Sequence, residues 1–440
     1  MPGRLTSTLK SMNELYDVTV LGLGPSGTVA AYRATQRGLK VLGIDPKGIN
    51  APSTIGVWAS QLPDWFPDEA VASRFTPEVI SRTGRQVLTA EYAMLVPGWE
   101  QQLGGFDVVE KKADPAITVL YGVPAQKRRP LRSWFQPKSD ELLSVMSEDD
   151  SFIDIVDHLW ITTTPSTMSA RQLAHGLVVP EGSVPEAHRR GVLMDFSPVA
   201  GFPEDGPVTF SYRVPLGDGT WLIEETILAT DGDSQTLLAH LEAKNLARLE
   251  QLGIATEDIR RTEVVSFPLG PRGIPGDRAR TPLGLALGMI PVSRRTSLDL
   301  SFLAGPWGGK GVKGEAHIGT AGGWIHPATG YSVGAVLAGT DEMLDRVLAG
   351  SPPTSRAWRV NYALRRFGLN VVLGFSPAQY QEFFAIVLGL PERDLLDYLI
   401  SASPWDTARV MVRIILRAFR QTPSTALAVF RLAPGALFRK

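Results

Sequence analysis

Two adjacent carboxylates stand inside an otherwise apolar run and are the residues best suited to acid chemistry. Glu224 and Glu225 lie within Thr220-Trp-Leu-Ile-Glu-Glu-Thr-Ile-Leu228, whose β-branched and aromatic residues predict a strand. Neighbours on a strand point to opposite faces, so only one of the two can face a given cavity. Apolar surroundings would raise the pKa of that glutamate and keep it protonated, as a general acid requires. From these residues alone, a strand-edge glutamate in a salt bridge is the favoured alternative.

A glycine-rich turn near the N-terminus lies between a predicted strand and a predicted helix. Residues 16–21 are aliphatic and β-branched, and residues 28–37 are rich in alanine. Between them stands Gly22-Leu-Gly-Pro-Ser-Gly27, and a second strand over 40–44 ends at Asp45. This order of elements is typical of a dinucleotide-binding unit: a strand, a glycine turn, a helix, and a second strand that ends at an acidic residue.

Each position of this turn has a physical role. Gly22 permits the tight turn, Gly24 lets the backbone approach a pyrophosphate, and Gly27 lets the helix pack on the strand. The helix N-terminus offers free N–H groups to the anion, and the carboxylate of Asp45 can bind ribose hydroxyls. FAD is favoured over NAD because the motif lies near the N-terminus of a long chain with no second copy, an argument from analogy. The predicted contacts are Gly22, Gly24, Pro25, Ser26, Gly27 and Asp45.

The composition excludes several classes of function. The 440 residues carry 44 Lys+Arg and 45 Asp+Glu, a net charge of -1 that argues against a nucleic-acid partner. The absence of cysteine excludes disulfides, thiolate metal sites and cysteine nucleophiles, and it fits a reducing compartment. No metal site is predicted. The sequence shows no secretory signal and no apolar run long enough to span a membrane. We expect a cytoplasmic protein.

Further segments resemble the lycopene cyclase family of flavoproteins. Ile55-Gly-Val-Trp58 resembles that family's Tyr/Asn-Gly-Val-Trp signature. The most specific match is Gly319-Thr-Ala-Gly-Gly-Trp-Ile-His-Pro-Ala-Thr-Gly-Tyr-Ser-Val333, which resembles Gly-x-Ala-Ala-Gly-x-x-His-Pro-Ala-Thr-Gly-Tyr-Ser-Val. Shorter matches are Leu193-Met-Asp-Phe196, Thr209-Phe-Ser-Tyr212, Val214-Pro-Leu-Gly217 and Leu222-Ile-Glu-Glu-Thr226.

The resemblance implies an α/β fold of the glutathione-reductase type. A Rossmann-like FAD-binding domain, discontinuous in sequence, would carry an inserted antiparallel-sheet substrate domain and a C-terminal helical region. The predicted ranges are 1–90, 170–200 and 313–349 for the FAD-binding domain, 91–169 and 201–312 for the substrate domain, and 350–440 for the helices.

The resemblance also implies a chemistry. Such a cyclase uses bound reduced FAD without net redox change: a carboxylic acid protonates a terminal alkene, the neighbouring double bond attacks the cation, and proton loss leaves a cyclohexene ring. The resemblance favours Glu224 as the acid, and it gives Glu225 either a structural role or a position beside the flavin. Both glutamates belong to the predicted catalytic site. The implied cofactor contacts outside the glycine turn are Val57, Trp58, Gly319, Thr320, Ala321, His326, Thr329, Gly330 and Tyr331, with His326 shaping the flavin-facing loop.

The sequence also departs from the family pattern. After Gly-Val-Trp the family carries x-Asp-Glu, where this chain has Ser60 and Gln61. Val178-Val-Pro-Glu-Gly-Ser183 replaces a Val-Val-Asp-Ala-x-Gly turn, and 271–318 forms a longer connection than the family has. These departures favour an isoprenoid or prenylated substrate other than lycopene. The alternatives are an FAD-dependent monooxygenase or epoxidase on an apolar terpenoid-like substrate, and a flavoprotein without catalytic activity.

Aromatic residues near these motifs are candidates to line a cavity for a cation, because ring faces stabilise positive charge. For any single one, ordinary core packing is the favoured interpretation. The candidates are Trp58, Phe210, Tyr212, Trp221, Trp307, Trp324 and Tyr331.

The C-terminal segment predicts a basic amphipathic helix. Arg409, Arg413, Arg417 and Arg420 recur at helical spacing among apolar residues. Such a helix either lies on the inner face of a membrane with its arginines near head groups, or docks on the protein with its arginines in water. An apolar isoprenoid substrate favours the membrane. Helix breaks are expected at 374–377, 390–391, 403–404 and 422–423.

Overall fold

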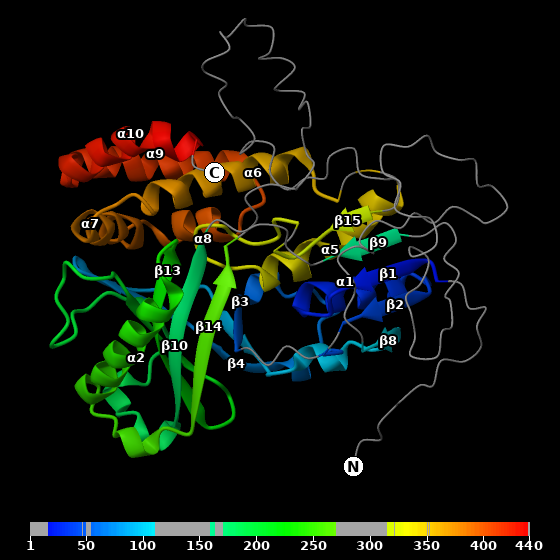
Figure 1. The fold of residues 1–440 in the computed structure, drawn as a ribbon, viewed down its shortest axis with the longest axis horizontal. Coiled ribbons are helices and arrows are strands. Elements are labelled where there is room, and N and C mark those ends of the chain that lie inside the picture. The colour runs from blue at the N-terminus through cyan, green and yellow to red at the C-terminus, as the bar shows by residue number, and fades with distance from the viewer. Residues whose placement is uncertain are drawn as a thin grey trace, which may run out of the picture.

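The computed structural model describes residues 16–45, 47–49, 54–110, 159–162, 170–269, 315–320, 322–349, 351 and 353–438. Ala321 and Trp307, two of the predicted site residues, lie outside these ranges. The described chain forms a parallel sheet, a larger mixed sheet and a layer of C-terminal helices that runs over the larger sheet (Figure 1).

The parallel sheet holds the glycine turn. Its order is β15-β9-β1-β2-β8, and each of its four pairings is parallel. Helix α1 (Pro25–Gln36) follows β1 and contacts α5 (Val333–Leu348), to which Arg33 and Arg37 are joined by ion pairs with Asp341. The strands are β1 (Val18–Leu21), β2 (Val41–Ile44), β8 (Asp107–Val109), β9 (Leu159–Thr162) and β15 (Glu315–His317).

The seven-stranded sheet carries the acidic strand, β13, in its interior. Its order is β14-β10-β13-β12-β11-β5-β6, with every neighbour antiparallel except the β11–β5 pair. Helix α2 (Ser234–Gln251), capped by Asp233, covers one face through β10 and β13. The strands are β5 (Glu78–Ser81), β6 (Gly84–Val87), β10 (Arg171–Pro180), β11 (Val192–Asp195), β12 (Phe210–Pro215), β13 (Thr220–Thr230) and β14 (Arg261–Pro268).

The strand pairing differs from the predicted domain ranges. The sequence places 170–200 in the FAD-binding domain, but β10 and β11 belong to the seven-stranded sheet. The strand that returns to the parallel sheet is β9, in register with β1 from Val18↔Leu159 onward, and β8 joins the far edge. The cause is that β10 is buried on both faces from Leu173 to Val179, and such an apolar run does not reveal whether its sheet is parallel or antiparallel.

A small antiparallel sheet links the two larger ones. Strand β7 (Tyr92–Leu95) lies between β3 (Ile55–Trp58) and β4 (Val71–Phe75). Trp58 and Tyr92 pack edge to face with their centroids 5.2 Å apart, and both are almost wholly buried. This sheet therefore holds the Gly-Val-Trp signature rigidly between the nucleotide turn and the acidic strand.

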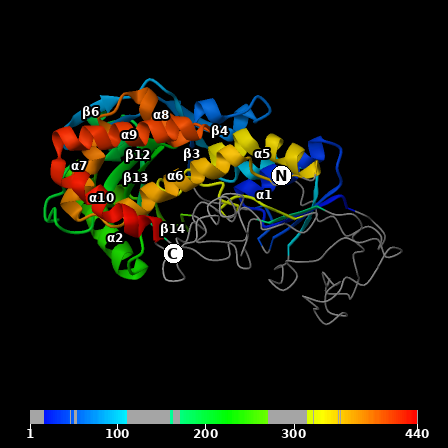
Figure 2. The same cartoon turned by 90° about the horizontal axis from the view of Figure 1, so that it is seen from above.

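Five helices form the C-terminal layer, and each predicted break separates two of them. Ser355, Ser376 and Ser403 cap α6, α7 and α9 by accepting backbone N–H groups, and prolines open α7, α9 and α10. The layer lies over β12 and β13 (Figure 2). The bounds are α6 (Arg356–Val372), α7 (Pro377–Leu388), α8 (Glu392–Ile400), α9 (Pro404–Gln421) and α10 (Pro423–Phe438).

The arginines of α9 do not form the outward stripe that the sequence suggests. Arg409 pairs with Asp394 of α8 at 2.8 Å, Arg413 also pairs with Asp394, and Arg417 donates to the carbonyl oxygen of Gly389 at 2.7 Å. The exposed stripe of α9 is instead apolar. It consists of Trp405, Val412, Leu416 and Phe419 and continues on α10 with Leu427 and Phe430. Among the described helices, none combines the length and the apolar content that a membrane span requires.

Candidate active site

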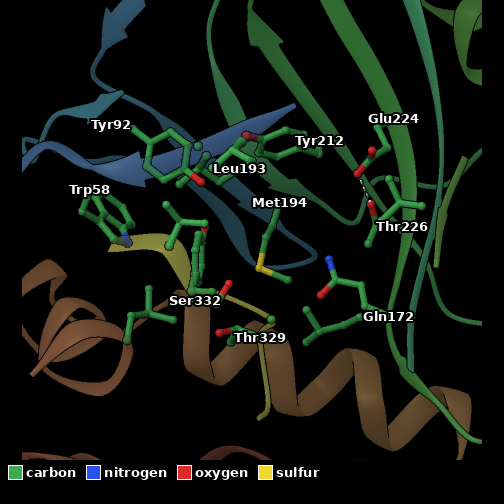
Figure 3. A pocket seen from close by; sticks show the side chains of 18 of the residues that line it. Trp58, Tyr92, Gln172, Leu193, Met194, Tyr212, Glu224, Thr226, Thr329 and Ser332 are labelled. Atoms are coloured by element: carbon green, nitrogen blue, oxygen red, sulfur yellow. Dashed lines mark hydrogen bonds between the residues drawn. The ribbon is translucent and has the colours of Figure 1, made fainter. Parts of the chain in front are cut away.

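A cavity of about 420 Å³ joins the glycine turn to the acidic strand. It extends from Pro25 at the start of α1, past Trp58 and Tyr331, to Glu224 on β13. Figure 3 shows the Glu224 side chain at one end of the cavity and Thr329 and Ser332 at another. The cavity therefore lies between the predicted cofactor site and the predicted acid.

The glycine turn has the shape of a phosphate cradle. Gly22 adopts a left-handed φ of 92°, and a Cβ on Gly27 would lie 1.8 Å from the carbonyl oxygen of Gly22, so no larger residue fits there. A Cβ on Gly24 would meet nothing within 4 Å. That open space in front of the first turn of α1 is the room that a pyrophosphate needs.

Asp45 fixes this turn from the end of β2. One carboxylate oxygen accepts the N–H of Leu23 at 2.9 Å, and the other accepts the N–H of Lys47 at 2.8 Å. Both bonds hold the acid beside the glycine turn, where a ribose would lie. These residues fit the adenosine and pyrophosphate half of FAD.

The 319–333 segment lines the cavity on the opposite side of the turn. Gly330 has a φ of 80°, and a Cβ there would lie 2.4 Å from Oε1 of Gln172, so the segment packs directly on β10. Three polar atoms on this cavity have no hydrogen-bond partner among the described residues: Nε1 of Trp58, Oε1 of Gln172 and Oγ1 of Thr329. A ligand with donors and acceptors, such as an isoalloxazine ring, matches such atoms.

His326 holds this segment in place from behind. Its Nδ1 accepts the N–H of Ala328 at 3.3 Å, and its Nε2 lies 3.2 Å from the carbonyl oxygen of Tyr398, which requires the proton on Nε2. Burial lowers the pKa of His326 well below its ordinary value. It is therefore a neutral residue that shapes the loop, and it does not line the cavity.

The predicted cofactor residues fall into two groups. Those that line the cavity are Pro25, Trp58, Thr320, Thr329, Gly330 and Tyr331. Those that form its supports or the adjoining turn are Gly22, Gly24, Ser26, Gly27, Asp45, Val57, Gly319 and His326.

Glu224 faces the cavity as a buried acid. It is 9% exposed, and the hydroxyl of Thr226 donates to its Oε1 at 2.7 Å. Burial raises the pKa of Glu224 to about 7, with smaller contributions from the charges of Glu263 and Glu225. A carboxyl group with this pKa is still partly protonated at neutral pH and can donate its proton to a substrate.

Glu225 points to the opposite face of β13. Its Oε1 accepts from Nε of Arg248 at 2.8 Å, and its Oε2 accepts from the hydroxyl of Thr209 at 2.6 Å. Arg248 also donates to the carbonyl oxygen of Ser197 at 3.0 Å. Glu225 is fully buried in this network beneath α2 and lies outside the cavity. The structure thus gives the two glutamates separate surroundings, and only Glu224 is placed to meet a substrate.

Glu263 lies two strands from Glu224 in the same register. Gly176 on β10 pairs with Glu224 on one side and with Glu263 on the other. A Cβ on Gly176 would lie 3.4 Å from Oε2 of Glu224, so no side chain of β10 separates the two acids. Glu263 accepts the hydroxyl of Thr54 at 2.8 Å and pairs with Arg261. Glu263 is therefore a second carboxylate that acts on the charge state of Glu224.

Aromatic rings form much of the remaining wall. Trp58, Phe210, Tyr212 and Tyr331 line the cavity, and Tyr92 joins them. Burial raises the pKa of Tyr92, Tyr212 and Tyr331, so all three phenols stay neutral. Trp221 packs instead into a core cluster beneath α2, and Trp324 stacks near Trp358 with centroids 4.5 Å apart.

Some cavity residues carry no sequence motif. Tyr92 and Gln172 could not be singled out because each stands in an ordinary strand pattern, and Met194 belongs to a quoted segment that gave it no role of its own. Glu263 has a usable signal, since it alternates with Val265 and Phe267, and both of those line the cavity. Period-two alternation along β14 places all three side chains on one face.

Comparison with known proteins gives a consistent result. The family model described as "Lycopene cyclase protein" matches residues 155–293 and 302–426. A lycopene beta cyclase of Synechococcus elongatus is 23% identical, over 93% of this chain and 94% of that protein. A protein of Deinococcus radiodurans described as an uncharacterized carotenoid cyclase is 24% identical, over 92% of this chain and 90% of that protein.

A solved structure shares the fold. It is a geranylgeranyl bacteriochlorophyll reductase-like protein of Thermoplasma acidophilum, with a TM-score of 0.53 and 12% identity. The match covers 95% of this chain and 99% of that one. At this identity the likeness concerns the fold alone, and it extends across the nucleotide sheet, the larger sheet and the helical layer.

Proposed function

The chain belongs to the lycopene cyclase family, and we propose that it is an FAD-dependent cyclase that closes a ring on an isoprenoid polyene. The observation that carries the proposal is the placement of Glu224, a buried carboxyl group with a raised pKa, on an aromatic cavity that reaches the nucleotide turn. The related proteins of Synechococcus elongatus and Deinococcus radiodurans, by name a lycopene beta cyclase and a carotenoid cyclase, support this substrate class.

The proposed reaction begins with proton transfer from Glu224 to a terminal alkene. The neighbouring double bond then attacks the tertiary cation, which forms the ring and moves the charge to a ring carbon. Loss of one proton from the adjacent carbon leaves a cyclohexene. One proton enters and one leaves, so the net reaction is an isomerisation, and the carboxylate of Glu224 is placed to recover a proton.

The cavity wall suits a cationic intermediate. Trp58, Tyr92, Tyr212 and Tyr331 present aromatic rings, and each ring face stabilises a cation by roughly 0.5–2 kcal/mol. Glu224 is the charged residue among the described lining side chains, so its carboxylate balances the charge once the proton has been transferred. The apolar remainder keeps water from trapping the cation.

The glycine turn and Asp45 would hold the adenosine and pyrophosphate of FAD, while Thr320, Thr329 and Gln172 would face its ring. A bound reduced flavin would supply electron-rich stabilisation beside the positive charge. Ser60 and Gln61 replace the family's acidic pair, and we propose on this ground a substrate other than lycopene.

The test is incubation of the purified protein with reduced FAD and acyclic polyenes in D₂O. The proposal expects an isomeric ring product that carries one deuterium. Parallel reactions under ¹⁸O₂ distinguish the alternative, because a monooxygenase or epoxidase would place the label in the product. A protein that binds FAD and converts none of the polyenes would contradict cyclisation.

Glu263 is expected to set the pH range of this activity. The active form of Glu224 is protonated, so activity should fall as pH rises through about 7. Removing the negative charge of Glu263 in the Glu263→Gln variant should lower the pKa of Glu224 and move that decline to lower pH. Thr226 and Tyr212, which face Glu224, keep their hydroxyls in both proteins, and the charge of Glu225, which also raises the pKa of Glu224, is unchanged. The measurement is the cyclisation rate between pH 5 and pH 9.

The matched control for this shift is Glu257→Gln, which removes an exposed carboxylate in the short 3-10 turn (Thr256–Asp258) that follows α2. It should leave the pH profile unchanged. Equal profiles for the parent protein and the Glu263→Gln variant would show that Glu263 has no influence on the acid.

The exposed apolar stripe of α9 and α10 is proposed to contact anionic lipid. Leu416, Phe419 and Phe430 are each more than 40% exposed, and the exposed cations Arg420 and Arg431 flank them. Apolar side chains would enter the head-group boundary while the arginines meet lipid phosphates.

Vesicle flotation tests this contact. Leu416→Asp should weaken binding to anionic phospholipid vesicles by roughly tenfold or more, because burying one such side chain is worth about 1.5–3 kcal/mol. Leu246→Asp, on exposed α2, is the control and should bind as the parent protein does. Equal binding by all three proteins would place the lipid contact elsewhere.

A further inference from the structure

The carboxylate of Glu392, at the start of α8, joins this helix to the link between β6 and β7, residues 88–91. We propose that Glu392 is a positioning residue for ring closure, which fixes the place of Leu88 and Tyr92 against the substrate. The inference rests on the proposed cyclisation and adds a residue that determines its rate and the ring isomer that it forms. We call this contact the clamp.

The clamp consists of three hydrogen bonds. Oε1 of Glu392 accepts the N–H of Thr89 at 2.8 Å and the N–H of Ala90 at 2.6 Å, and Oε2 accepts the hydroxyl of Thr89 at 2.8 Å. Burial raises the pKa of Glu392, but these three bonds outweigh it and hold that pKa below its ordinary value. The side chain is therefore ionised at neutral pH, and bonds to an ionised group are stronger than those between neutral groups.

Glu392 holds the middle of the link, whose two ends have other partners. The N–H of Leu88 donates to the carbonyl oxygen of Pro77 at 2.9 Å, and the carbonyl oxygen of Glu91 accepts the N–H of Ala59 at 3.0 Å. The two N–H groups between these ends both donate to Glu392. Without the carboxylate, water would become their partner, and the link would lose its fixed place relative to α8.

Residues on both sides of the clamp line the reaction cavity. Leu88 and Tyr92 flank the two bound N–H groups in sequence, and both contribute to the cavity wall. Leu395 and Leu399 of α8 line it as well, and their spacing places them on one face of the helix. The clamp therefore sets the position of the α8 side of the cavity relative to the side that carries Tyr92.

Tyr92 transmits this constraint to other rings of the cavity wall. Burial raises the pKa of Tyr212 and of Tyr331, and a hydrogen bond with Tyr92 acts against that rise in each. The rings of Tyr92 and Tyr331 meet edge to face with their centroids 6.3 Å apart. Figure 3 shows the hydroxyl of Tyr212 directed toward Tyr92. A shift of Tyr92 would therefore displace two more aromatic side chains of the wall.

The placement of these rings bears on the last step of the proposed reaction. After ring closure the positive charge lies on one ring carbon, and the carbons beside it compete to lose a proton. Each choice gives a different double-bond isomer, and the electrons of the broken C–H bond form the new double bond. Because aromatic faces stabilise the cation where they lie against it, a displaced wall changes both the rate and the choice. In an active site, a misplacement of about 1 Å lowers a rate by about 10²-fold.

The experiment separates the hydrogen bonds of the clamp from the volume of the side chain. Glu392→Leu has no acceptor, whereas Glu392→Gln keeps Oε1, the atom that accepts both backbone N–H groups. Arg393→Leu is the control, since it alters the next side chain of α8, which is 87% exposed. Each protein, loaded with reduced FAD, is assayed with an acyclic polyene for kcat and for the ratio of double-bond isomers. Thermal unfolding verifies that each variant is folded.

We expect Glu392→Leu to lower kcat at least tenfold and to change the ratio of ring isomers. Glu392→Gln and Arg393→Leu should remain within about threefold of the parent protein and give its isomer ratio. A role in stability alone would lower the unfolding temperature of Glu392→Leu and leave kcat per folded molecule and the isomer ratio unchanged, which would overturn the inference. Glu392→Ala replaces Glu392→Leu if that variant does not fold.

Equilibrium binding separates this inference from the proposed function. The absorption spectrum of the polyene reports its transfer into a protein cavity without any turnover. If the parent protein binds the polyene and closes no ring, the proposed reaction fails. In that case, binding at least fivefold weaker by Glu392→Leu than by Glu392→Gln would still support the clamp as the contact that shapes the cavity, and equal binding by the two variants would contradict it.

Discussion

Replacing Glu224 by glutamine is expected to reduce the rate of cyclisation by about 10²–10⁴-fold, the usual contribution of a general acid. Glutamine keeps the shape of the side chain and removes the proton that the alkene must receive. FAD binding should be unchanged, because Glu224 belongs to β13 and the phosphate cradle belongs to the turn between β1 and α1. Single-turnover kinetics on a polyene, with flavin fluorescence as the binding measurement, will check both expectations.

The same substitution should not destabilise the fold at alkaline pH. The pKa of Glu224 is raised in the folded state, so its contribution to stability is present at low pH and is lost as pH rises through about 7. Glutamine never ionises and avoids that loss. At pH 8 the variant should therefore unfold at a temperature no lower than the parent protein. A Glu224→Gln protein that cyclises at the parent rate would remove Glu224 from the mechanism.

Replacing Glu225 by glutamine is expected to lower the free energy of unfolding by about 3–5 kcal/mol, because it leaves a buried guanidinium without its partner. Arg248 and Glu225 have side chains 2% and 0% exposed, and their Nε–Oε1 distance is 2.8 Å. Urea denaturation followed by circular dichroism measures this loss. Activity per folded molecule should stay within a few-fold of the parent protein.

The double variant Glu225→Gln, Arg248→Met supplies the control. Removing both charges should recover a large part of the lost stability, since a buried pair replaced by neutral side chains costs far less than a broken one. The two substitutions thus form a matched pair. Glu224→Gln should remove activity and leave stability unchanged, whereas Glu225→Gln should lower stability and leave activity per folded molecule nearly unchanged. Loss of turnover without loss of stability in Glu225→Gln would assign Glu225 to the reaction.

The nucleotide turn could be predicted from the sequence almost completely. Its geometry depends on local constraints that only glycine satisfies. At Gly27, for example, a Cβ would lie 1.8 Å from the carbonyl oxygen of Gly22. The alternation of strand faces likewise required Glu224 and Glu225 to have different partners. Residues alone could not say which of the two would meet the cavity, because that depends on Arg248 of α2, which lies 23 residues after Glu225 in the chain.

The membership of strands in sheets was harder to predict. β9 and β10 are both apolar, and their pairing is decided by contacts with strands distant in sequence, β1 for the first and β13 for the second. The orientation of α9 was missed for a related reason. Its arginines recur at helical spacing, but Asp394 and Asp397 of α8 attract two of them toward the protein and leave the apolar side chains outside.

One helix, α9, separates two surfaces that would otherwise be independent. Ile414 lines the apolar chamber between α6, α7, α8, α9 and α10, and Leu416, two residues later, belongs to the exposed stripe. An apolar ligand inside and a lipid surface outside would therefore contact the same helix. Where both contacts favour one position of α9, reciprocity requires that the factor by which the ligand changes affinity for the surface equal the factor by which the surface changes affinity for the ligand. The strength of surface attachment would then report whether the protein is loaded, and loading would depend on where the protein resides.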